Sequence, residues 1–376
     1  MLPAIKLHRF SLADVMPSSF SAVSGTANSL GLPAVDRVVV LVADGLGATS
    51  LAASAGHARF LSPLLSPAST IGSRFPTTTA SALATLTTGQ TPGIHGLVGY
   101  TVLDAANDRV VNELNGWDDR LDPATWQRSK TLFETGADAG IPSFVIGMER
   151  YRNSGFTRAV LRGAQYRSGS TLADRFAKAR AVLDEFDRSV LYVYVPELDQ
   201  AGHAKGWRSA EWTAALEELD GVVRSFAGTL GPREGMLLTA DHGMLDVPES
   251  SHVLFDTDPL LIDGIRHLAG EPRALQLHFE PDASEALRER VIERWRSVEG
   301  SRSWIVDRRD AIESGWFGPT VDPDVAPRIG EVIIAARKAI AYYDSRSTHG
   351  KTMVGQHGSW STEESSVPLL KFGAFS

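Results

Sequence analysis

The stretch VVVLVADG at residues 38–45 is the best guide to the fold. Its first five residues are aliphatic and leave no polar face, which is typical of a strand buried on both sides of a sheet. Similar apolar runs occupy residues 190–195 and 236–239, and 142–147 is a further candidate. Helix-compatible segments such as 171–187 lie between these runs. This alternation predicts an α/β fold, with a largely parallel central sheet and helices on both faces.

The pattern changes after about residue 256. Residues 273–279 alternate apolar and polar side chains as a half-buried strand does, and 283–298 are amphipathic with a helical period. Residues 330–336 form another apolar run. We therefore predict an α+β insertion or cap at 256–345, inserted in a core made of residues 1–255 and 346–376.

Composition excludes several classes of protein. The chain has 376 residues, 43% of them hydrophobic and 22% charged, with a formal net charge of -8, so no surface for a nucleic acid duplex is expected. There are no cysteines, which excludes disulfides, zinc–thiolate sites and thiol nucleophiles. Residues 1–10 lack the apolar segment of a signal peptide, and no apolar run is long enough to span a membrane. We expect a cytoplasmic protein with no membrane partner, and the sequence does not specify its oligomeric state.

Acidic residues and histidines follow the three strongest strand candidates. Asp44 follows the first, Asp199 and His203 follow the second, and Asp241-His242 follow the third. Sites in open parallel sheets form at the carboxyl ends of strands, so these side chains would meet in one crevice. Each Asp could equally be an ordinary helix cap or turn residue. Together they form a set of imidazoles and carboxylates, which are ligands of divalent metals.

A second cluster lies at residues 75–89. Phe75-Pro76 ends an extended segment, and the run of small residues from Ala80 predicts a tightly packed helix. A threonine at the start of that helix would lie at the positive end of its dipole, where a phosphate group is favoured. The alternative is a helix-capping threonine without chemistry.

Taken in order, these residues resemble the alkaline phosphatase superfamily, from about residue 36 to the C-terminus. The resemblance implies two divalent metal ions, most simply zinc, with manganese or iron as alternatives. One ion would be bound by Asp199, His203 and His357. The other would be bound by Asp44, Asp241 and His242, together with the hydroxyl of the nucleophile Thr79.

Two of these assignments involve a choice between neighbours. Thr79 is preferred because it lies ten residues before Gly89, as the superfamily's nucleophile does; Thr78 is the second choice, and Thr77 is expected to face away. His357 is preferred to His349 because the sequence after it resembles the superfamily's closing element. His95 is expected to be packed in the interior or to contact the metal ligands without binding a metal ion itself.

The spacing of glycines and histidines is similar to that of the type I phosphodiesterase / nucleotide pyrophosphatase branch. Gly89-x-x-Pro92-x-x-His95-Gly96 resembles one of its elements, and Asp199-x-x-Gly202-His203-x-x-Gly206 resembles another. A sulfatase is not expected, because its Cys/Ser-x-Pro-x-Arg motif is missing. The chain departs from the nucleotide pyrophosphatases at Ser81 and Ala82, where they have Pro-Asn, which puts nucleotide specificity in doubt.

The function expected from this resemblance is phosphoester hydrolysis through a phospho-threonine intermediate, with a small phosphoester, for example a nucleotide, as substrate. A phosphodiesterase is preferred. The alternatives are a phosphomonoesterase, a phosphonate hydrolase, a phosphosugar mutase and a non-catalytic binding protein. Tyr100, Asn115 and Trp117 could line a base or sugar pocket, although packing is the simpler role. The cluster Glu149, Arg150 and Arg152 is consistent with a solvated surface.

Overall fold

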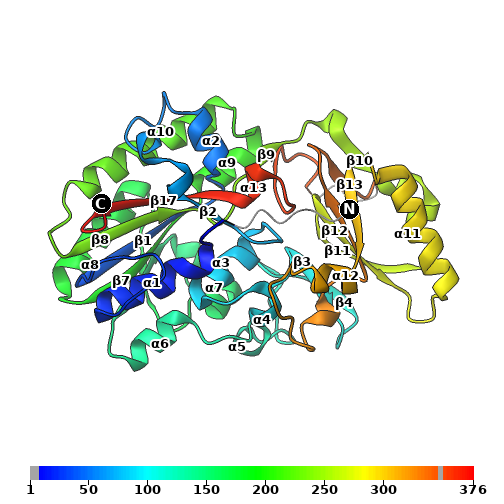
Figure 1. Cartoon of the computed structure of the whole chain (residues 1–376), viewed down its shortest axis with the longest axis horizontal. Helices are drawn as coiled ribbons and strands as arrows, with labels where there is room; N and C mark the ends of the chain where they lie inside the picture. The colour runs from blue at the N-terminus through cyan, green and yellow to red at the C-terminus, as the bar shows by residue number, and fades with distance from the viewer. Residues whose placement is uncertain (1–7, 346–349) are drawn as a thin grey trace.

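The computed structural model describes residues 8–345 and 350–376 and contains two large sheets side by side (Figure 1). The main sheet has seven strands in the order β2-β17-β8-β1-β7-β5-β6. The second sheet has six strands in the order β13-β14-β12-β11-β3-β4. Among the helices of these described residues, none is long and apolar enough to cross a membrane.

The middle of the main sheet is parallel. Strand β1 (Arg37–Ala43) pairs in parallel with β7 (Ser189–Val195) on one side and β8 (Glu234–Thr239) on the other. Strands β5 (Ser143–Gly147) and β6 (Gln165–Ser168) continue the parallel pairing. Their side chains form the largest hydrophobic core. The prediction of an α/β fold with a largely parallel sheet is confirmed.

The chain returns to this sheet at its C-terminal end. Strand β17 (Ser366–Gly373) pairs antiparallel with β8, and the short edge strand β2 (Thr70–Gly72) pairs antiparallel with β17. Helices cover both faces of the sheet (Figure 1). They include α1 (Leu12–Ser24), α2 (Ala48–Ala53), α3 (Thr79–Thr88), α6 (Leu132–Asp138), α7 (Gly155–Val160), α8 (Leu172–Glu185), α9 (Glu197–Lys205) and α10 (Ala210–Ala227).

The second sheet is antiparallel and is built from two separate parts of the chain. Its strands are β3 (Thr101–Asp104), β4 (Arg109–Asn112), β11 (Ile265–Glu271), β12 (Ala274–Phe279), β13 (Ser303–Asp307) and β14 (Val332–Ala336). Helices α11 (Glu285–Glu299) and α12 (Arg308–Glu313) accompany it. The predicted boundaries of the cap, 256–345, leave out β3 and β4. Pairing of Thr101 with Gly270 joins this distant hairpin to the sheet, and hydrophobic periodicity carries no signal for such a long-range pair.

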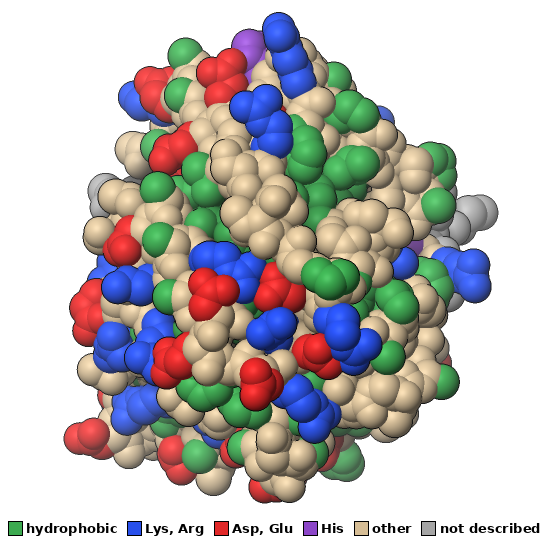
Figure 2. Space-filling view, turned by 90° about the vertical axis from the view of Figure 1, so that its left-hand side faces the viewer, with side chains coloured by type: hydrophobic (Ala, Val, Ile, Leu, Met, Phe, Trp, Pro, Cys, Tyr) green, Lys and Arg blue, Asp and Glu red, His purple; other side chains and the backbone are tan. Residues whose placement is uncertain are grey.

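At the end of the molecule far from the second sheet, acidic and basic side chains are interspersed (Figure 2). The face shown has no extended area of one charge. Arg233 and Asp36 form one ion pair of opposite charges, with 2.6 Å between Nε and Oδ2.

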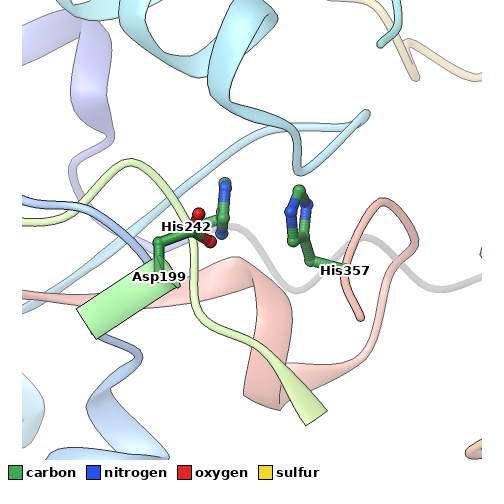
Figure 3. A group of neighbouring side chains, drawn as sticks. All are labelled: Asp199, His242 and His357. Carbon is green, nitrogen blue, oxygen red and sulfur yellow. The ribbon is translucent and has the colours of Figure 1, made fainter. Parts of the chain in front are cut away.

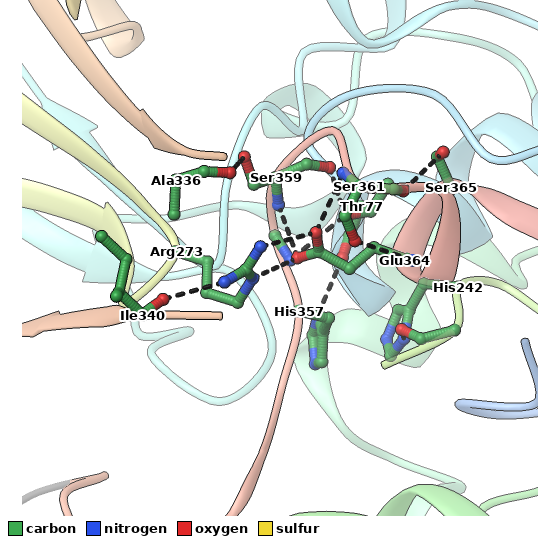
Figure 4. A network of polar contacts seen from close by, with 12 residues as sticks. Thr77, His242, Arg273, Ala336, Ile340, His357, Ser359, Ser361, Glu364 and Ser365 are labelled. Carbon is green, nitrogen blue, oxygen red and sulfur yellow. Dashed lines mark hydrogen bonds and ion pairs between the residues drawn. The ribbon is translucent and has the colours of Figure 1, made fainter. Parts of the chain in front are cut away.

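A buried ion pair joins the two sheets (Figure 4). Arg273, between β11 and β12, donates to both carboxylate oxygens of Glu364 at 2.6 and 3.0 Å. Glu364 lies in α13 (Thr362–Ser365), just before β17, and both side chains are fully buried. Burial alone would raise the pKa of Glu364, but the charge and hydrogen bonds of Arg273 outweigh it and hold the pKa below its ordinary value. Glu364 also accepts hydrogen bonds from the backbone of Ser359 and Ser361. The pair therefore fixes the loop that follows residue 357.

We predict that Glu364→Gln lowers the free energy of unfolding by about 3–5 kcal/mol, because it leaves the Arg273 guanidinium buried without a counter-charge. Chemical denaturation of the variant measures this loss. The matched control is Glu280→Gln, which breaks the exposed pair with Arg266 in the same part of the molecule. An equal, small effect of both substitutions would contradict the structural role given to the buried pair.

Candidate metal centre

The polar residues predicted from the sequence meet at the carboxyl edge of the main sheet. Parallel pairing aligns Ala43 with Val195, and Val42 with Thr239, so β1, β7 and β8 end side by side. Asp44 directly follows β1, and Asp241 follows β8 after one residue. Asp199 is in the first turn of α9, which begins two residues after β7. Backbone register therefore brings three carboxylates into one crevice.

One group of potential ligands consists of Asp44, Asp241 and His242, whose ligand atoms all lie within 4.8 Å of one another. His242 Nε2 is 3.6 Å from Asp44 Oδ1 and 3.5 Å from Asp241 Oδ2. The other oxygen of each carboxylate is already used. Asp241 Oδ1 accepts from the backbone N–H of Gly45 and His242, and Asp44 Oδ2 accepts from the Tyr194 hydroxyl. One oxygen of each carboxylate is thus directed at the centre of the group.

Asp199, His242 and His357 form an adjoining group, again within 4.8 Å (Figure 3). The rings of His242 and His357 are stacked with their centroids 3.6 Å apart. His203 completes the arrangement, because its Nε2 is 3.3 Å from Asp199 Oδ1 and 3.2 Å from His357 Nε2. The structure therefore brings together all six side chains that the sequence predicted as metal ligands. Their role as ligands remains a prediction.

Backbone carbonyls orient the imidazole rings. Nδ1 of His203 lies 2.7 Å from the carbonyl oxygen of Gly355, and Nδ1 of His357 lies 2.8 Å from that of Thr77. A carbonyl oxygen only accepts, so Nδ1 of each ring is the donor. Nε2 of each ring is then the nitrogen left for a metal ion in the crevice.

The electrostatics of the crevice are unfavourable without a cation. Burial raises the pKa of Asp44 well above its ordinary value, and the neighbouring Asp199 and Asp241 add to the effect. Burial also raises the pKa of Asp199 to about 6 and lowers the pKa of His242 to about 3. For His357, burial and the other two imidazoles lower the pKa well below its ordinary value.

Three buried carboxylate oxygens in the crevice accept no hydrogen bond from the part of the chain that the structure describes. They are Asp44 Oδ1, Asp199 Oδ1 and Asp241 Oδ2, the same atoms that approach the histidines. Buried polar atoms without partners are rare in folded proteins and require an explanation. Unpaired carboxylates beside neutral imidazoles are the donor set that divalent cations take in proteins. The residues present therefore fit two metal ions.

Thr79 lies beside this crevice. It is the first residue of α3, is 8% exposed, and its Oγ1 is 3.1 Å from His242 Nε2. Thr78 is the N-cap residue, and its hydroxyl has no hydrogen-bond partner. Thr77 faces away from the crevice: its hydroxyl donates to the carbonyl oxygen of Ser359 and accepts from the N–H of Gly358. Of the three consecutive threonines, Thr79 is the one whose hydroxyl lies within hydrogen-bond distance of a residue in the group Asp44, Asp241 and His242.

His95 and His349 are two further histidines near predicted site residues in the sequence. His95 is fully buried; its Nε2 is 3.0 Å from Thr85 Oγ1, and its Nδ1 accepts from the backbone N–H of Leu97. Burial lowers its pKa to about 3, so it is a neutral packing residue of the helix that carries Thr79. His349 lies outside the described residues.

Sequence reasoning missed Tyr194, which donates to Asp44 Oδ2. It lies within the run 190–195, where it is indistinguishable from a core aromatic residue. Its position near the end of its strand is the one indication of a role at the site. Val195, the next residue, pairs with Ala43, which directly precedes Asp44.

Two cavities meet at the crevice, and both are lined by Thr79 and Asp199. One, of about 520 Å³, extends over the main sheet, with Asn115, Trp117 and Arg150 in its wall. The other, of about 460 Å³, lies towards the second sheet and includes Tyr100. Tyr100, Asn115 and Trp117 thus border cavities that Thr79 also lines, and Trp117 in addition packs against two hydrophobic clusters, as expected. Glu149 and Arg152 pair with each other at 2.9 Å at the surface, as predicted for a solvated cluster.

A model of the Type I phosphodiesterase / nucleotide pyrophosphatase family matches residues 38–360. The chain belongs to this family of metal-dependent phosphoester hydrolases, which confirms the resemblance found in the sequence.

Curated relatives cover different shares of the chain. A phosphopentomutase of Anaeromyxobacter sp. (strain K) is 31% identical over 145 residues, which is 38% of this chain and 36% of that protein. An uncharacterized pyrophosphatase/phosphodiesterase of Schizosaccharomyces pombe is 25% identical over 323 residues, which is 79% of this chain and 63% of that protein. The match therefore spans about a third of the length of the phosphopentomutase.

Solved structures share the fold at low identity. Human ectonucleotide pyrophosphatase / phosphodiesterase 5 has a TM-score of 0.67 and 17% identity, with 89% of this chain and 87% of that chain covered. An inactive variant of the murine enzyme in complex with AMP has a TM-score of 0.68 and 14% identity, with 90% and 88% covered. Phosphonoacetate hydrolase from Sinorhizobium meliloti 1021, in complex with phosphonoformate, has a TM-score of 0.68 and 15% identity, with 90% and 91% covered.

We predict that divalent metal stabilises the protein, because it neutralises buried carboxylates that have no other partner. An ion present at 100 times its dissociation constant adds about 2.7 kcal/mol to the free energy of unfolding. In EDTA, Asp241→Asn should have a higher melting temperature than the unsubstituted protein, because the substitution removes one of three crowded carboxylates. When zinc is added, the melting temperature of Asp241→Asn should rise less than that of the unsubstituted protein. Thermal unfolding with EDTA and with zinc measures both effects. A melting temperature independent of metal in the unsubstituted protein would refute the metal centre.

Proposed function

We propose that this chain is a two-metal phosphoester hydrolase in which Thr79 is the nucleophile. The observation that carries the proposal is the position of Thr79 Oγ1, 3.1 Å from His242 Nε2, at a crevice where three carboxylate oxygens accept no hydrogen bond from the described residues. Thr79 also opens α3, whose positive N-terminal end favours an incoming phosphate group.

The metal ions would be held by Asp199, His203 and His357 on one side, and by Asp44, Asp241 and His242 on the other. When bound, two such cations lower the pKa of a hydroxyl at the site and balance the charge of the phosphoryl group. Zinc is supported by the nitrogen and oxygen donors, with manganese or iron as alternatives.

The chain's own residues carry out the covalent steps. The bond from Thr79 Oγ1 to phosphorus forms while the bond from phosphorus to the leaving oxygen breaks, and the hydroxyl proton passes to solvent. Water then cleaves the phospho-threonine, restoring the hydroxyl and releasing the phosphorylated product. Tyr194 holds the Asp44 carboxylate in place through its hydrogen bond, and the carbonyl oxygens of Thr77 and Gly355 keep two imidazoles aimed at the crevice.

The two cavities on either side of Thr79 support a diester substrate, because a diester has a substituent on both sides of its phosphorus atom. The family match supports the same class, with nucleotides as one possibility. Ser81 and Ala82 stand where the nucleotide pyrophosphatases have Pro-Asn, so the chain lacks that amide near the phosphate. A second candidate, a phosphosugar mutase, is supported by the 31% identity to phosphopentomutases over 145 residues.

We predict that Thr79→Ala lowers kcat at least about a thousandfold while the bound metal content stays unchanged, because the nucleophile is lost and the six charged or imidazole ligands remain. The matched control is Thr78→Ala, which removes the neighbouring hydroxyl and should keep activity within about tenfold. Steady-state kinetics and elemental analysis on the same preparations give both readouts. A fully active Thr79→Ala protein would eliminate the covalent mechanism.

We predict faster release of nitrophenolate from bis(p-nitrophenyl) phosphate than from p-nitrophenyl phosphate, by at least about tenfold in kcat/KM. The reason is that the second aryl group fills a cavity that the monoester leaves empty. The ratio measured in one assay series separates the diesterase from the monoesterase.

Incubation with a bis-phosphorylated sugar tests the mutase: isomerisation without phosphate release would favour that alternative over the hydrolase.

A further inference from the structure

Glu271 is a buried carboxyl group next to the crevice that the proposed mechanism does not use. It is the last residue of β11 and is 5% exposed. Its side chain passes directly over the backbone of Gly358, where an added Cβ would lie 2.4 Å from the Glu271 Cγ. Gly358 follows the predicted ligand His357, and Glu271 lines the same cavity as Thr79. The second sheet therefore places one carboxyl group beside the nucleophile.

Among residues 8–345 and 350–376, no cationic side chain pairs with this carboxyl group. Neither of its oxygens accepts a hydrogen bond of normal geometry, although the Thr78 hydroxyl and the Tyr100 backbone lie near it. Burial raises its pKa well above the ordinary value, and the negative charges of Glu364 and Glu113 add to the effect. Glu364, in contrast, is paired with Arg273, and the buried Glu113 accepts hydrogen bonds from Trp126 and Gly99.

The cavity in front of Glu271 has no lysine or arginine among the described residues that line it, and its basic side chains are the two imidazoles of His203 and His357. Its wall contains the rings of Tyr100, Tyr342 and Tyr343, together with the acidic residues Glu271 and Asp344. The cavity over the main sheet differs, because Arg150 lies in its wall. The two sides of the crevice thus offer different chemistry to the two substituents of a diester.

In-line attack decides which substituent meets Glu271. The attacking and leaving oxygens lie on opposite sides of phosphorus. Thr79 Oγ1 lies 3.1 Å from His242 Nε2, whereas His203 and His357 line the cavity of Glu271 and not the cavity over the main sheet. The leaving oxygen therefore departs into the cavity that contains Glu271. This step rests on the proposed function.

We propose that Glu271 is a specificity residue that selects a leaving alcohol carrying its own hydrogen-bond donor, a hydroxyl or ammonium group, over a leaving phosphate or pyrophosphate. A carboxyl group without a partner is satisfied by a donor on the ligand. A leaving phosphate would instead bring more oxygen atoms against Glu271, in a cavity whose described wall has no lysine or arginine to pair with them. Tyrosine rings favour an ammonium group through their faces.

The test uses alcohols as acceptors in the reverse of the leaving step. During turnover of bis(p-nitrophenyl) phosphate, an added alcohol competes with water for phospho-Thr79. The bond from Thr79 Oγ1 to phosphorus breaks, a bond from the alcohol oxygen forms, and the alcohol proton passes to solvent. Ethanol, ethane-1,2-diol and ethanolamine are similar in size and differ in the second donor. Mass spectrometry measures the ratio of alkyl p-nitrophenyl phosphate to p-nitrophenyl phosphate.

We expect the unsubstituted protein to transfer to ethane-1,2-diol or ethanolamine at least about tenfold more than to ethanol. The acceptor with the larger ratio tells whether hydroxyl or ammonium is preferred. Glu271→Leu should abolish the preference for ethane-1,2-diol or ethanolamine over ethanol. The variant should fold, because the substitution removes no hydrogen bond of normal geometry. Glu271→Gln, which keeps the shape and an acceptor oxygen, should retain part of the preference for the diol. The control is Glu293→Gln, an exposed acid on α11, which should leave the ratios unchanged.

Equal transfer to all three alcohols, no transfer to any of them, or an unchanged preference in Glu271→Leu would overturn the role of Glu271. These outcomes are distinct from failure of the proposed function, in which the unsubstituted protein would release no nitrophenolate at all. An independent readout is equilibrium binding of the diol and of ethanol to the metal-loaded Thr79→Ala protein, where the same preference should appear and should vanish in Thr79→Ala/Glu271→Leu.

Discussion

The structure depends on one electrostatic constraint: three carboxylates are buried within a few ångströms of one another at the ends of adjacent parallel strands. Asp44, Asp199 and Asp241 each have an oxygen that accepts no hydrogen bond, and burial raises the pKa of all three. Such a cluster opposes folding unless cations are bound. The surrounding structure keeps the cluster together nonetheless, through the register of β1 with β7 and β8 and through backbone hydrogen bonds to Asp241. The buried carboxylates lower the stability of the fold without bound cations, and residues that do so are characteristic of functional sites.

The second sheet extends this site. It contributes Glu271 at the end of β11, and it is fastened to the core by the buried pair Arg273–Glu364, two residues from Glu271 along the chain. The same pair holds the loop after His357. One structural link thus sets both the position of a predicted metal ligand and the wall of the cavity beside it. A sheet held in this way can determine specificity without taking part in the covalent steps.

Much of this could be predicted from the sequence because the signals were local. The runs at 38–42, 190–195 and 236–239 are buried strands, and the polar residues that follow them meet as the rule for parallel sheets requires. The family resemblance added His357 and selected Thr79, which no periodicity could do. Contributions from distant segments were missed. Strand β3 pairs with β11 across more than 150 residues, Tyr194 looks like any core aromatic residue, and Glu271 has no motif around it.

The proposed function requires two cations bound between these carboxylates and imidazoles. Anomalous diffraction from crystals of the zinc-loaded protein, recorded on both sides of the zinc absorption edge, would locate them. We expect two peaks per chain, one among Asp199, His203 and His357 and one among Asp44, Asp241 and His242, with Thr79 Oγ1 next to the second. A crevice without anomalous density at saturating zinc, with the three carboxylates paired to other protein groups, would contradict the proposed function.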